Sequence, residues 1–175
     1  MSRNKGIRRA LVLAMGLGLL AGCENAMAPE EQIDVTEGLG PGIHPIVVLA
    51  GINAGTTDVQ LHLRRVQVDA TISSFQGELS YDTNAMTLKG ADLPQAVMGA
   101  WNEIAPGKVR FAGAALEGVP DAPVLTLHFE AKQAVQGNAF GVKMEEIVAA
   151  TDFHSLTTQV VQREQPLFSR VPLRQ

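Results

Sequence analysis

The sequence is poor in cysteine, in aromatic residues and in helical periodicity, and each shortage excludes a class of protein. It holds one cysteine in 175 residues, so no disulfide can form within the chain and apolar burial must hold the fold together. The chain has eight aromatic residues, and only one of them is a tryptophan. One tryptophan does not make the flat aromatic strip that binds crystalline polysaccharide. Apolar residues hardly recur at the helical period, which argues against a mainly helical fold.

Motifs for catalysis and metal binding are also missing from the sequence. The four histidines, His44, His62, His128 and His154, show no metal-ligand spacing, and there is no second cysteine beside them. No serine outside the basic amino-terminal segment belongs to a G-x-S-x-G or an S-x-x-K motif, and no glycine-rich phosphate loop appears. We therefore predict that the protein is not an enzyme and holds no catalytic residue, no metal ion and no cofactor.

Two acidic positions could be mistaken for functional sites. Glu145 and Glu146 resemble a carboxylate pair, but neighbours in a strand point to opposite faces. Asp82 opens a D-x-N stretch, but Thr87 stands where an EF-hand loop needs glycine and Leu93 where it needs glutamate. We predict instead that the Asp82 carboxylate accepts backbone hydrogen bonds and starts a turn. A calcium site of another geometry stays open.

The amino terminus has the layout of an export signal. Four basic residues precede an apolar run at positions 10–20, and no acidic residue appears before Glu24. Such a run is short for a membrane span and typical of a secretory signal. It ends in Leu20-Ala21-Gly22-Cys23, which resembles the lipobox of bacterial lipoproteins. The resemblance implies a signal peptide over residues 1–22, cleavage before Cys23 and acylation of its thiol.

An acylated Cys23 predicts a protein of the cell envelope that is held on a membrane by its acyl chains. Glu24 follows the cysteine where an aspartate would resemble the inner-membrane retention signal. We therefore expect the outer membrane, on its periplasmic or its surface side, if the cell has one.

The charge of the mature chain argues against nucleic-acid binding. Removal of the signal leaves ten Lys and Arg against all eighteen Asp and Glu, a formal charge of −8. A chain this acidic is a poor ligand for the phosphate backbone of DNA or RNA and for anionic lipid surfaces.

The remaining chain suits a single domain. Residues 23–44 are polar and then rich in glycine and proline, which predicts a flexible tether. We expect the domain over residues 45–162 and a carboxyl-terminal tail over residues 163–175.

Short segments with alternating or apolar character follow one another through the domain, separated by turn signals. In Asp58 to Arg64, for example, Val59, Leu61 and Leu63 alternate with Gln60, His62 and Arg64, the period of a strand with one buried face. We expect strands over 46–50, 58–64, 72–81, 86–88, 108–112, 124–131 and 141–144, with a less regular one over 156–161. This pattern indicates an antiparallel β-sandwich or barrel. Residues 94–100 allow either a short helix or a loop, and residues 145–150 are similarly ambiguous.

Several of these segments resemble the strands of a cohesin domain, in the right order. The most characteristic is Ser74 to Asp82, an alternating strand that ends in Tyr-Asp and is followed by the apolar Met86 and Leu88. Residues 55–61, 107–113 and 125–132 resemble an earlier strand and two later ones. The resemblance covers roughly residues 45–152 and implies a jelly-roll β-sandwich of about eight or nine strands, in a superfamily that also holds cellulose-binding modules. Trp101 with its surroundings and residues 153–156 have no clear counterpart.

The resemblance implies a binding module that captures a dockerin-like protein on an exposed sheet face. In this chain the outward residues of the most characteristic strand, and thus the candidate partner-binding residues, are Ser74, Gln76, Glu78 and Ser80. Two other functions stay open: binding of a polysaccharide, in which Trp101 in its polar, loop-like setting would stack on a sugar, and a structural role as an envelope lipoprotein.

Overall fold

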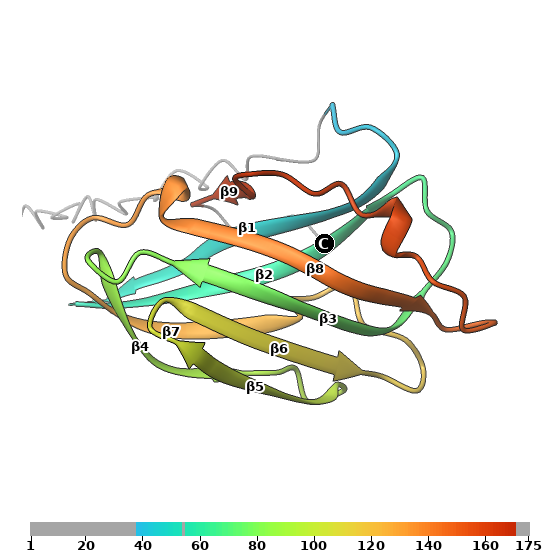
Figure 1. Ribbon diagram of the computed structural model, residues 1–175, viewed down its shortest axis with the longest axis horizontal. Coiled ribbons are helices and arrows are strands. Elements are labelled where there is room, and N and C mark those ends of the chain that lie inside the picture. Colours follow the sequence, from blue (N-terminus) through green and yellow to red (C-terminus); the bar gives the residue numbers. More distant parts are fainter. Residues whose placement is uncertain (1–37, 54, 171–175) are drawn as a thin grey trace, which may run out of the picture.

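The computed structural model describes residues 38–53 and 55–170 and shows two β-sheets packed face to face (Figure 1). The strands are β1 (Gly42–Asn53), β2 (Thr56–Val66), β3 (Ile72–Tyr81), β4 (Met86–Asp92), β5 (Met98–Ala105), β6 (Lys108–Ala114), β7 (Leu125–Ala131), β8 (Phe140–Ala149) and β9 (Leu167–Ser169). Two short 3-10 turns, η1 (Gly137–Ala139) and η2 (Thr157–Gln159), are the only helical elements in this part of the chain. The predicted all-β sandwich of eight or nine strands is confirmed.

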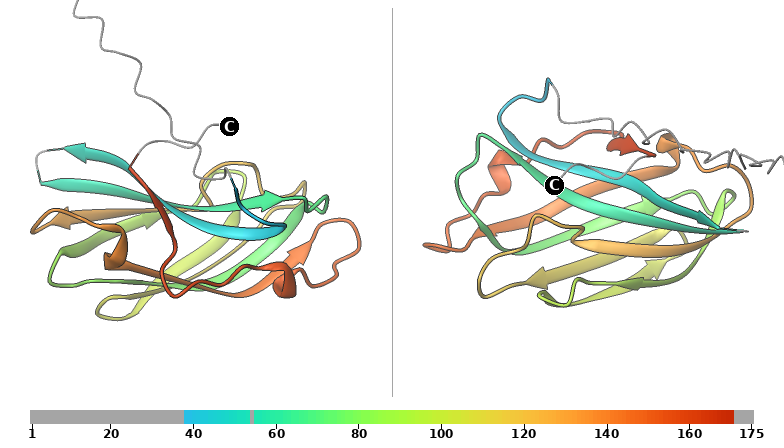
Figure 2. Two further views of the ribbon diagram at one scale, coloured as in Figure 1. Left: turned by 90° about the horizontal axis from the view of Figure 1, so that it is seen from above. Right: turned by 180° about the vertical axis from the view of Figure 1, so that it is seen from behind.

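The two sheets differ in size and are joined by chain crossings (Figure 2). One has five strands in the order β4-β7-β2-β1-β9, and the other has four in the order β5-β6-β3-β8. All pairs in both sheets are antiparallel except β1 with β9, which is parallel. None of the described helical elements is long and apolar enough to span a membrane.

The core lies between the sheets and is built by the period-2 alternation seen in the sequence. In β3, Phe75, Leu79 and Tyr81 are buried, and the Tyr81 ring packs edge-on against Phe129 at 4.9 Å between centroids. Gly77 completes this row, because a Cβ there would lie 2.8 Å from the Lys143 carbonyl oxygen and 2.9 Å from the Phe111 ring. The predicted inward parity of this strand is therefore confirmed.

The turn after β3 forms as the sequence predicts. The backbone N–H of Asn84 donates a hydrogen bond to Asp82 Oδ1 at 2.8 Å, and the N–H groups of Ala85 and Met86 donate to the Asp82 carbonyl, both at 3.1 Å. The aspartate thus starts the turn into β4, as expected of this residue type.

Strand β5 was not expected from the sequence. The ambiguous region 94–100 contains no helix. It begins with one turn, in which the Val97 N–H donates a hydrogen bond to the Pro94 carbonyl at 2.9 Å, and β5 follows directly. All β5 residues except Trp101 are exposed, so the strand has no apolar alternation to reveal it. Conversely, the expected strand over 156–161 is mostly the η2 turn, with a single bridge from Val160 to Ile43.

The domain limits of 45–162 are too narrow at both ends. Strand β1 begins at Gly42, inside the expected tether, because its pairing with β2 extends to the Gly42–Val66 pair. Strand β9 lies inside the expected tail and pairs with residues 46–48 of β1. The expected signal peptide and the lipidation site Cys23 lie outside the described residues.

Candidate functional site

The outer face of the four-stranded sheet gathers the candidate partner-binding residues. Ser74, Gln76, Glu78 and Ser80 alternate with buried residues along β3 and are half-buried themselves, since β3 lies between β6 and β8. The residues that share this side by register come from all four strands: Met98, Ala100 and Asn102 of β5, Lys108, Arg110, Ala112 and Ala114 of β6, the four of β3, and Lys143, Glu145 and Glu146 of β8. We call this set the outer face.

Hydrogen bonds and ion pairs orient the polar side chains in the middle of the outer face. Gln76 Nε2 donates to Glu145 Oε2 at 2.9 Å, and Arg110 Nη2 donates to the other oxygen of Glu145 at 3.3 Å. Lys108 pairs with Glu78 at 3.3 Å. The hydrogen bond from Gln76, helped by the charge of Arg110, lowers the pKa of Glu145. The face therefore presents a fixed pattern of charges.

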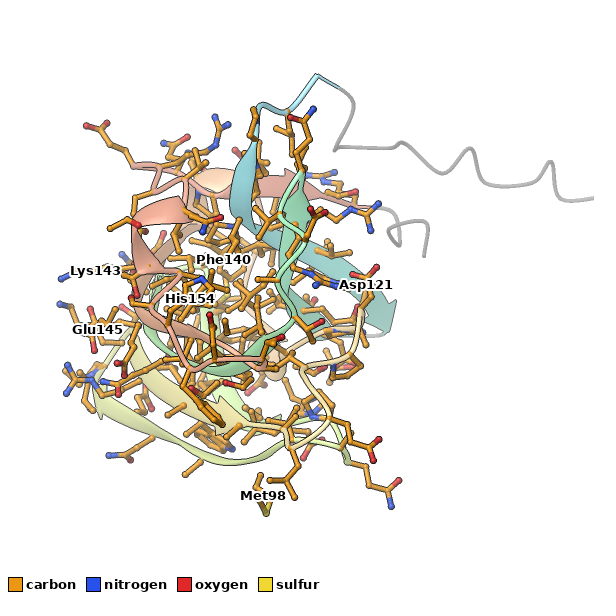
Figure 3. The ribbon with its side chains drawn as sticks, turned by 90° about the vertical axis from the view of Figure 1, so that its right-hand side faces the viewer. Met98, Asp121, Phe140, Lys143, Glu145 and His154 are labelled. Carbon is orange, nitrogen blue, oxygen red and sulfur yellow. The ribbon has the colours of Figure 1, made fainter. Side chains whose placement is uncertain are left out.

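Both acidic residues of the Glu145-Glu146 pair lie on this face, so the expectation that they point to opposite sides is wrong. The register along β3 and β8 shifts between the Gln76–Glu146 and Gly77–Met144 pairs, which leaves Glu145 as one extra residue. Such a β-bulge breaks the strict alternation of a strand. Glu145 reaches Gln76 and Arg110 while Glu146 is exposed beside it, and Figure 3 shows Lys143 and Glu145 projecting from the same side of the molecule.

An apolar patch lies at the β5 side of the outer face. Met98 is 68% exposed and Ile104 is 45% exposed, and Figure 3 shows Met98 projecting into solvent. Ile104 lies at a register shift of β5 and lines a hollow together with Gln76 and Ala112, so it also belongs to the outer face. Met98 and Ala100 are paired across the strands with Ala114 and Ala112. A shallow hollow of about 390 Å³ lies over these alanines, with Gln76 and Glu146 at its margin.

This apolar patch was not predicted from the sequence, and the reason is physical. The alternation of β6 is clear, with Val109 and Phe111 buried between exposed Lys108 and Arg110, so its outward alanines could have been found. The β5 residues could not, because an exposed edge strand that contains glycine and alanine has no periodic signal.

Trp101 lies in a strand and not in a loop as expected. It faces Phe111 across the β5–β6 pair, and Phe111 is buried in the core. The indole is half-buried and packs against the core, so it offers less surface to a ligand than a tryptophan in an exposed loop. Its predicted contact with a sugar stays untested.

The four histidines belong to different parts of the chain: His44 to β1, His62 to β2, His128 to β7 and His154 to the segment after β8. His128 on the five-stranded sheet contacts Asp58 and Asp92, at 2.7 and 3.0 Å, and these hydrogen bonds raise its pKa. His44 is buried in β1, and burial lowers the pKa of His62. Within the described residues no group of His, Cys, Asp and Glu side chains is arranged to hold a metal ion.

Comparison with known proteins identifies the fold by shape and not by sequence. No protein-family model matches the chain, and no curated protein matches it either. Solved structures do match. The sixth cohesin of scaffoldin B from Acetivibrio cellulolyticus, in complex with a Cel5 dockerin, superposes with a TM-score of 0.54 at 14% identity, over 75% of this chain and 99% of that one.

Two further cohesins give the same result. The OlpA cohesin of Clostridium thermocellum, solved in a type I cohesin–dockerin complex, has a TM-score of 0.53 at 16% identity, over 69% of this chain and 94% of that one. The seventh ScaB type I cohesin from Pseudobacteroides cellulosolvens has a TM-score of 0.51 at 13% identity, covering 78% and 96%. The chain therefore has the cohesin fold, as its sequence pattern predicts.

Proposed function

We propose that the protein is a non-catalytic binding module of the cell envelope, which captures a protein partner on the outer face of its four-stranded sheet. The observation that carries the proposal is the combination on that face of exposed apolar side chains, Met98 and Ile104, with an ordered group of charges around Glu145. Exposed apolar side chains occur together with polar and charged groups in protein–protein interfaces.

The outer face suits a partner that is itself folded and charged. Arg110, Lys143 and Lys108 lie among Glu78, Glu145 and Glu146, so both signs of charge are present within one small area. Such a mixed pattern favours a partner with the complementary pattern and disfavours others, because like charges brought together at an interface are costly.

A dockerin-like module is the class of partner that we propose. One support is that two of the matching cohesins were solved in complexes with dockerins. The other is that this chain has an exposed sheet face with apolar and charged side chains on which a protein could dock. At 14% and 16% identity the contact residues themselves are not carried over, so the candidates are the residues named here on the outer face.

A matched pair of charge reversals tests the face. Glu78 and Glu130 both lie in strands and both pair with a lysine, Glu78 with Lys108 on the four-stranded sheet and Glu130 with Lys89 on the five-stranded sheet. The immobilised domain would first be used to isolate a partner from exported proteins of the same organism, and calorimetry would then measure its affinity. We expect Glu78→Lys to weaken binding at least about tenfold and Glu130→Lys to leave it unchanged.

If Glu130→Lys weakened binding and Glu78→Lys did not, the partner would bind elsewhere. Equal affinity of both variants and the unaltered protein would likewise rule out this face. Thermal unfolding of both variants serves as the control. The exposed pair of Glu130 contributes little to stability, and a preserved melting temperature of Glu78→Lys shows that the exchange at this half-buried residue leaves the fold intact.

We also propose that Cys23 carries the lipid that holds the module on a membrane. Its position after a basic segment and an apolar run supports this. Cells fed an alkyne-tagged fatty acid should incorporate the tag into the unaltered protein and not into Cys23→Ser. Equal labelling of the variant, or no labelling of the unaltered protein, would contradict lipidation.

A further inference from the structure

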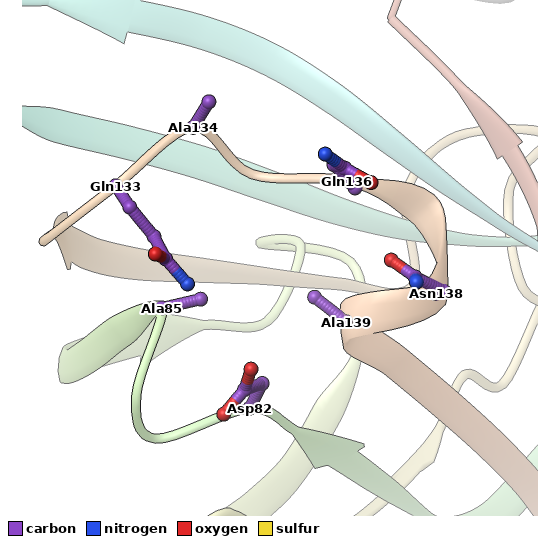
Figure 4. A pocket seen from close by; sticks show the side chains of 7 residues that line it. All are labelled: Asp82, Ala85, Gln133, Ala134, Gln136, Asn138 and Ala139. Carbon is purple, nitrogen blue, oxygen red and sulfur yellow. The ribbon is translucent and has the colours of Figure 1, made fainter.

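A polar pocket of about 420 Å³ opens at one end of the sandwich, where β3 ends and β8 begins (Figure 4). Its walls are the turn between β3 and β4 and the connection between β7 and β8. The lining residues are Asp82, Ala85, Gln133, Ala134, Gln136, Asn138 and Ala139. None of them belongs to the outer face, so the pocket is a second and separate candidate site.

Backbone hydrogen bonds tie the two walls of the pocket together. The Asp82 N–H donates to the Ala139 carbonyl at 2.9 Å, and the N–H groups of Lys132 and Gln133 donate to the Ala85 carbonyl at 2.8 and 3.4 Å. Lys132 Nζ also donates to the Thr83 carbonyl at 2.7 Å. The pocket is therefore formed before any ligand arrives, which lowers the entropic cost of binding.

The polar groups around the pocket are available to a ligand. Only Oδ1 of Asp82 is occupied, by the Asn84 N–H at 2.8 Å. Among the described residues, no hydrogen bond engages the side-chain amides of Gln133, Gln136 and Asn138. Figure 4 shows Asp82, Gln133 and Asn138 around one space, with the small side chains of Ala85 and Ala139 beside it.

The chemistry of the lining excludes several classes of ligand. A cation such as Ca²⁺ takes six to eight oxygens, usually with several carboxylates, and Asp82 is the only carboxylate here. An anion would meet the negative charge of Asp82 with no lysine or arginine in the lining to balance it. An apolar ligand would cover the free amides and leave them without hydrogen bonds, which is costly.

The geometry points to a neutral, hydroxyl-rich small molecule, a mono- or disaccharide, as the ligand of this pocket. Each amide offers two N–H donors and a carbonyl acceptor, and the free carboxylate oxygen of Asp82 accepts from hydroxyls. Hydroxyl groups both donate and accept, so a sugar satisfies all of these groups at once. The volume lies within the usual range for small-molecule sites, and the absence of an aromatic ring from the lining predicts weak binding.

Nuclear magnetic resonance titration of the domain with cellobiose, maltose and chitobiose tests this inference. We expect at least one of these neutral disaccharides to give saturable shifts of backbone amide signals in residues 82–85 and 133–139. The double variant Gln133→Ala/Asn138→Ala should weaken that binding at least about tenfold, because two amide partners are lost. The matched control is Asn102→Ala, an exposed amide on the outer face, which should bind like the unaltered protein.

A second variant tests the role of charge. Asp82→Asn keeps an oxygen that can start the turn but removes the negative charge, so it should admit glucuronate, which the unaltered protein should reject.

Saturable shifts confined to the pocket, lost in the double variant, support the inference. No saturable shift with any of the three disaccharides, shifts elsewhere on the domain, or equal affinity in the double variant would overturn it. Because this readout involves no protein partner, it is independent of the proposed capture function.

Discussion

At the scale of single residues, Gly77 shows how closely the two sheets constrain this sequence. It stands at an inward position of β3 where any side chain would meet the Lys143 carbonyl and the Phe111 ring. In the sequence it is the one small residue in a row of bulky inward residues, Phe75, Leu79 and Tyr81. The structure adds the reason, which is the close approach of the β8 backbone and of an aromatic ring from β6.

Gly77→Ala should therefore destabilise the domain. The added Cβ would lie 2.8 Å from a backbone oxygen that cannot move without shifting β8, and overpacking of this kind costs about 1–3 kcal/mol. Urea denaturation measures the difference. Gly90→Ala is the matched control, because a Cβ at Gly90 meets nothing within 4 Å. Equal stability of Gly77→Ala and the unaltered domain would contradict the packing described here.

The ion pairs of His128 with Asp58 and Asp92 should make the stability of the domain depend on pH. Hydrogen bonds from the ring to Asp58 and Asp92 raise its pKa above 6.5, so the folded state binds the proton more tightly than the unfolded state. This stabilisation is complete below pH 6.5 and is lost as the pH rises through the folded pKa. The groups are largely exposed, so it amounts to less than about 1 kcal/mol.

The difference in unfolding free energy between the unaltered domain and His128→Gln should thus shrink from pH 5.5 to pH 8. The comparison isolates His128 from His62, whose lowered pKa acts in the opposite direction and is common to both proteins. A difference that stays constant or grows with pH would show that the aspartates do not hold the proton on His128.

At the scale of elements, the strands with one buried face could be predicted from the sequence and the others could not. Residues 72–81 were expected as a strand and are one, because every second side chain enters the core. Strand β5 was missed because almost all of it is exposed, and the bulge at Glu145 was missed because nothing local marks an extra residue. The outward residues of β3 were therefore predictable, whereas their apolar neighbours Met98 and Ile104 required the structure.

Strand β9 should contribute to stability although it has only three residues. Its Phe168 stacks on Phe140 at 6.1 Å between centroids and packs against the core. We expect Phe168→Ala to lower the free energy of unfolding by about 2 kcal/mol, less than for a fully buried phenylalanine. Phe153, which is 75% exposed, provides the matched control, and Phe153→Ala should change stability little. A negligible loss in Phe168→Ala would mean that β9 is not part of the folded unit.

At the scale of the whole molecule, the sandwich presents three chemically different surfaces. The outer face of the four-stranded sheet combines ordered charges with an exposed apolar patch, the five-stranded sheet carries the His128 group, and one end opens into the amide-lined pocket. The cohesin fold follows from the strand order and from the matches to solved cohesins.

Methyl cross-saturation from a bound partner tests the central claim most directly. The outer face carries its own probes, the methyl groups of Met98, Ile104, Ala100 and Ala112, and the methyl group of Thr126, on the outward side of β7 in the other sheet, provides the reference. Irradiation of an unlabelled partner should reduce the signals of the outer-face methyls and leave Thr126 unchanged. Signal loss at Thr126 with none at Met98 and Ile104 would show that the partner binds elsewhere and would contradict this account.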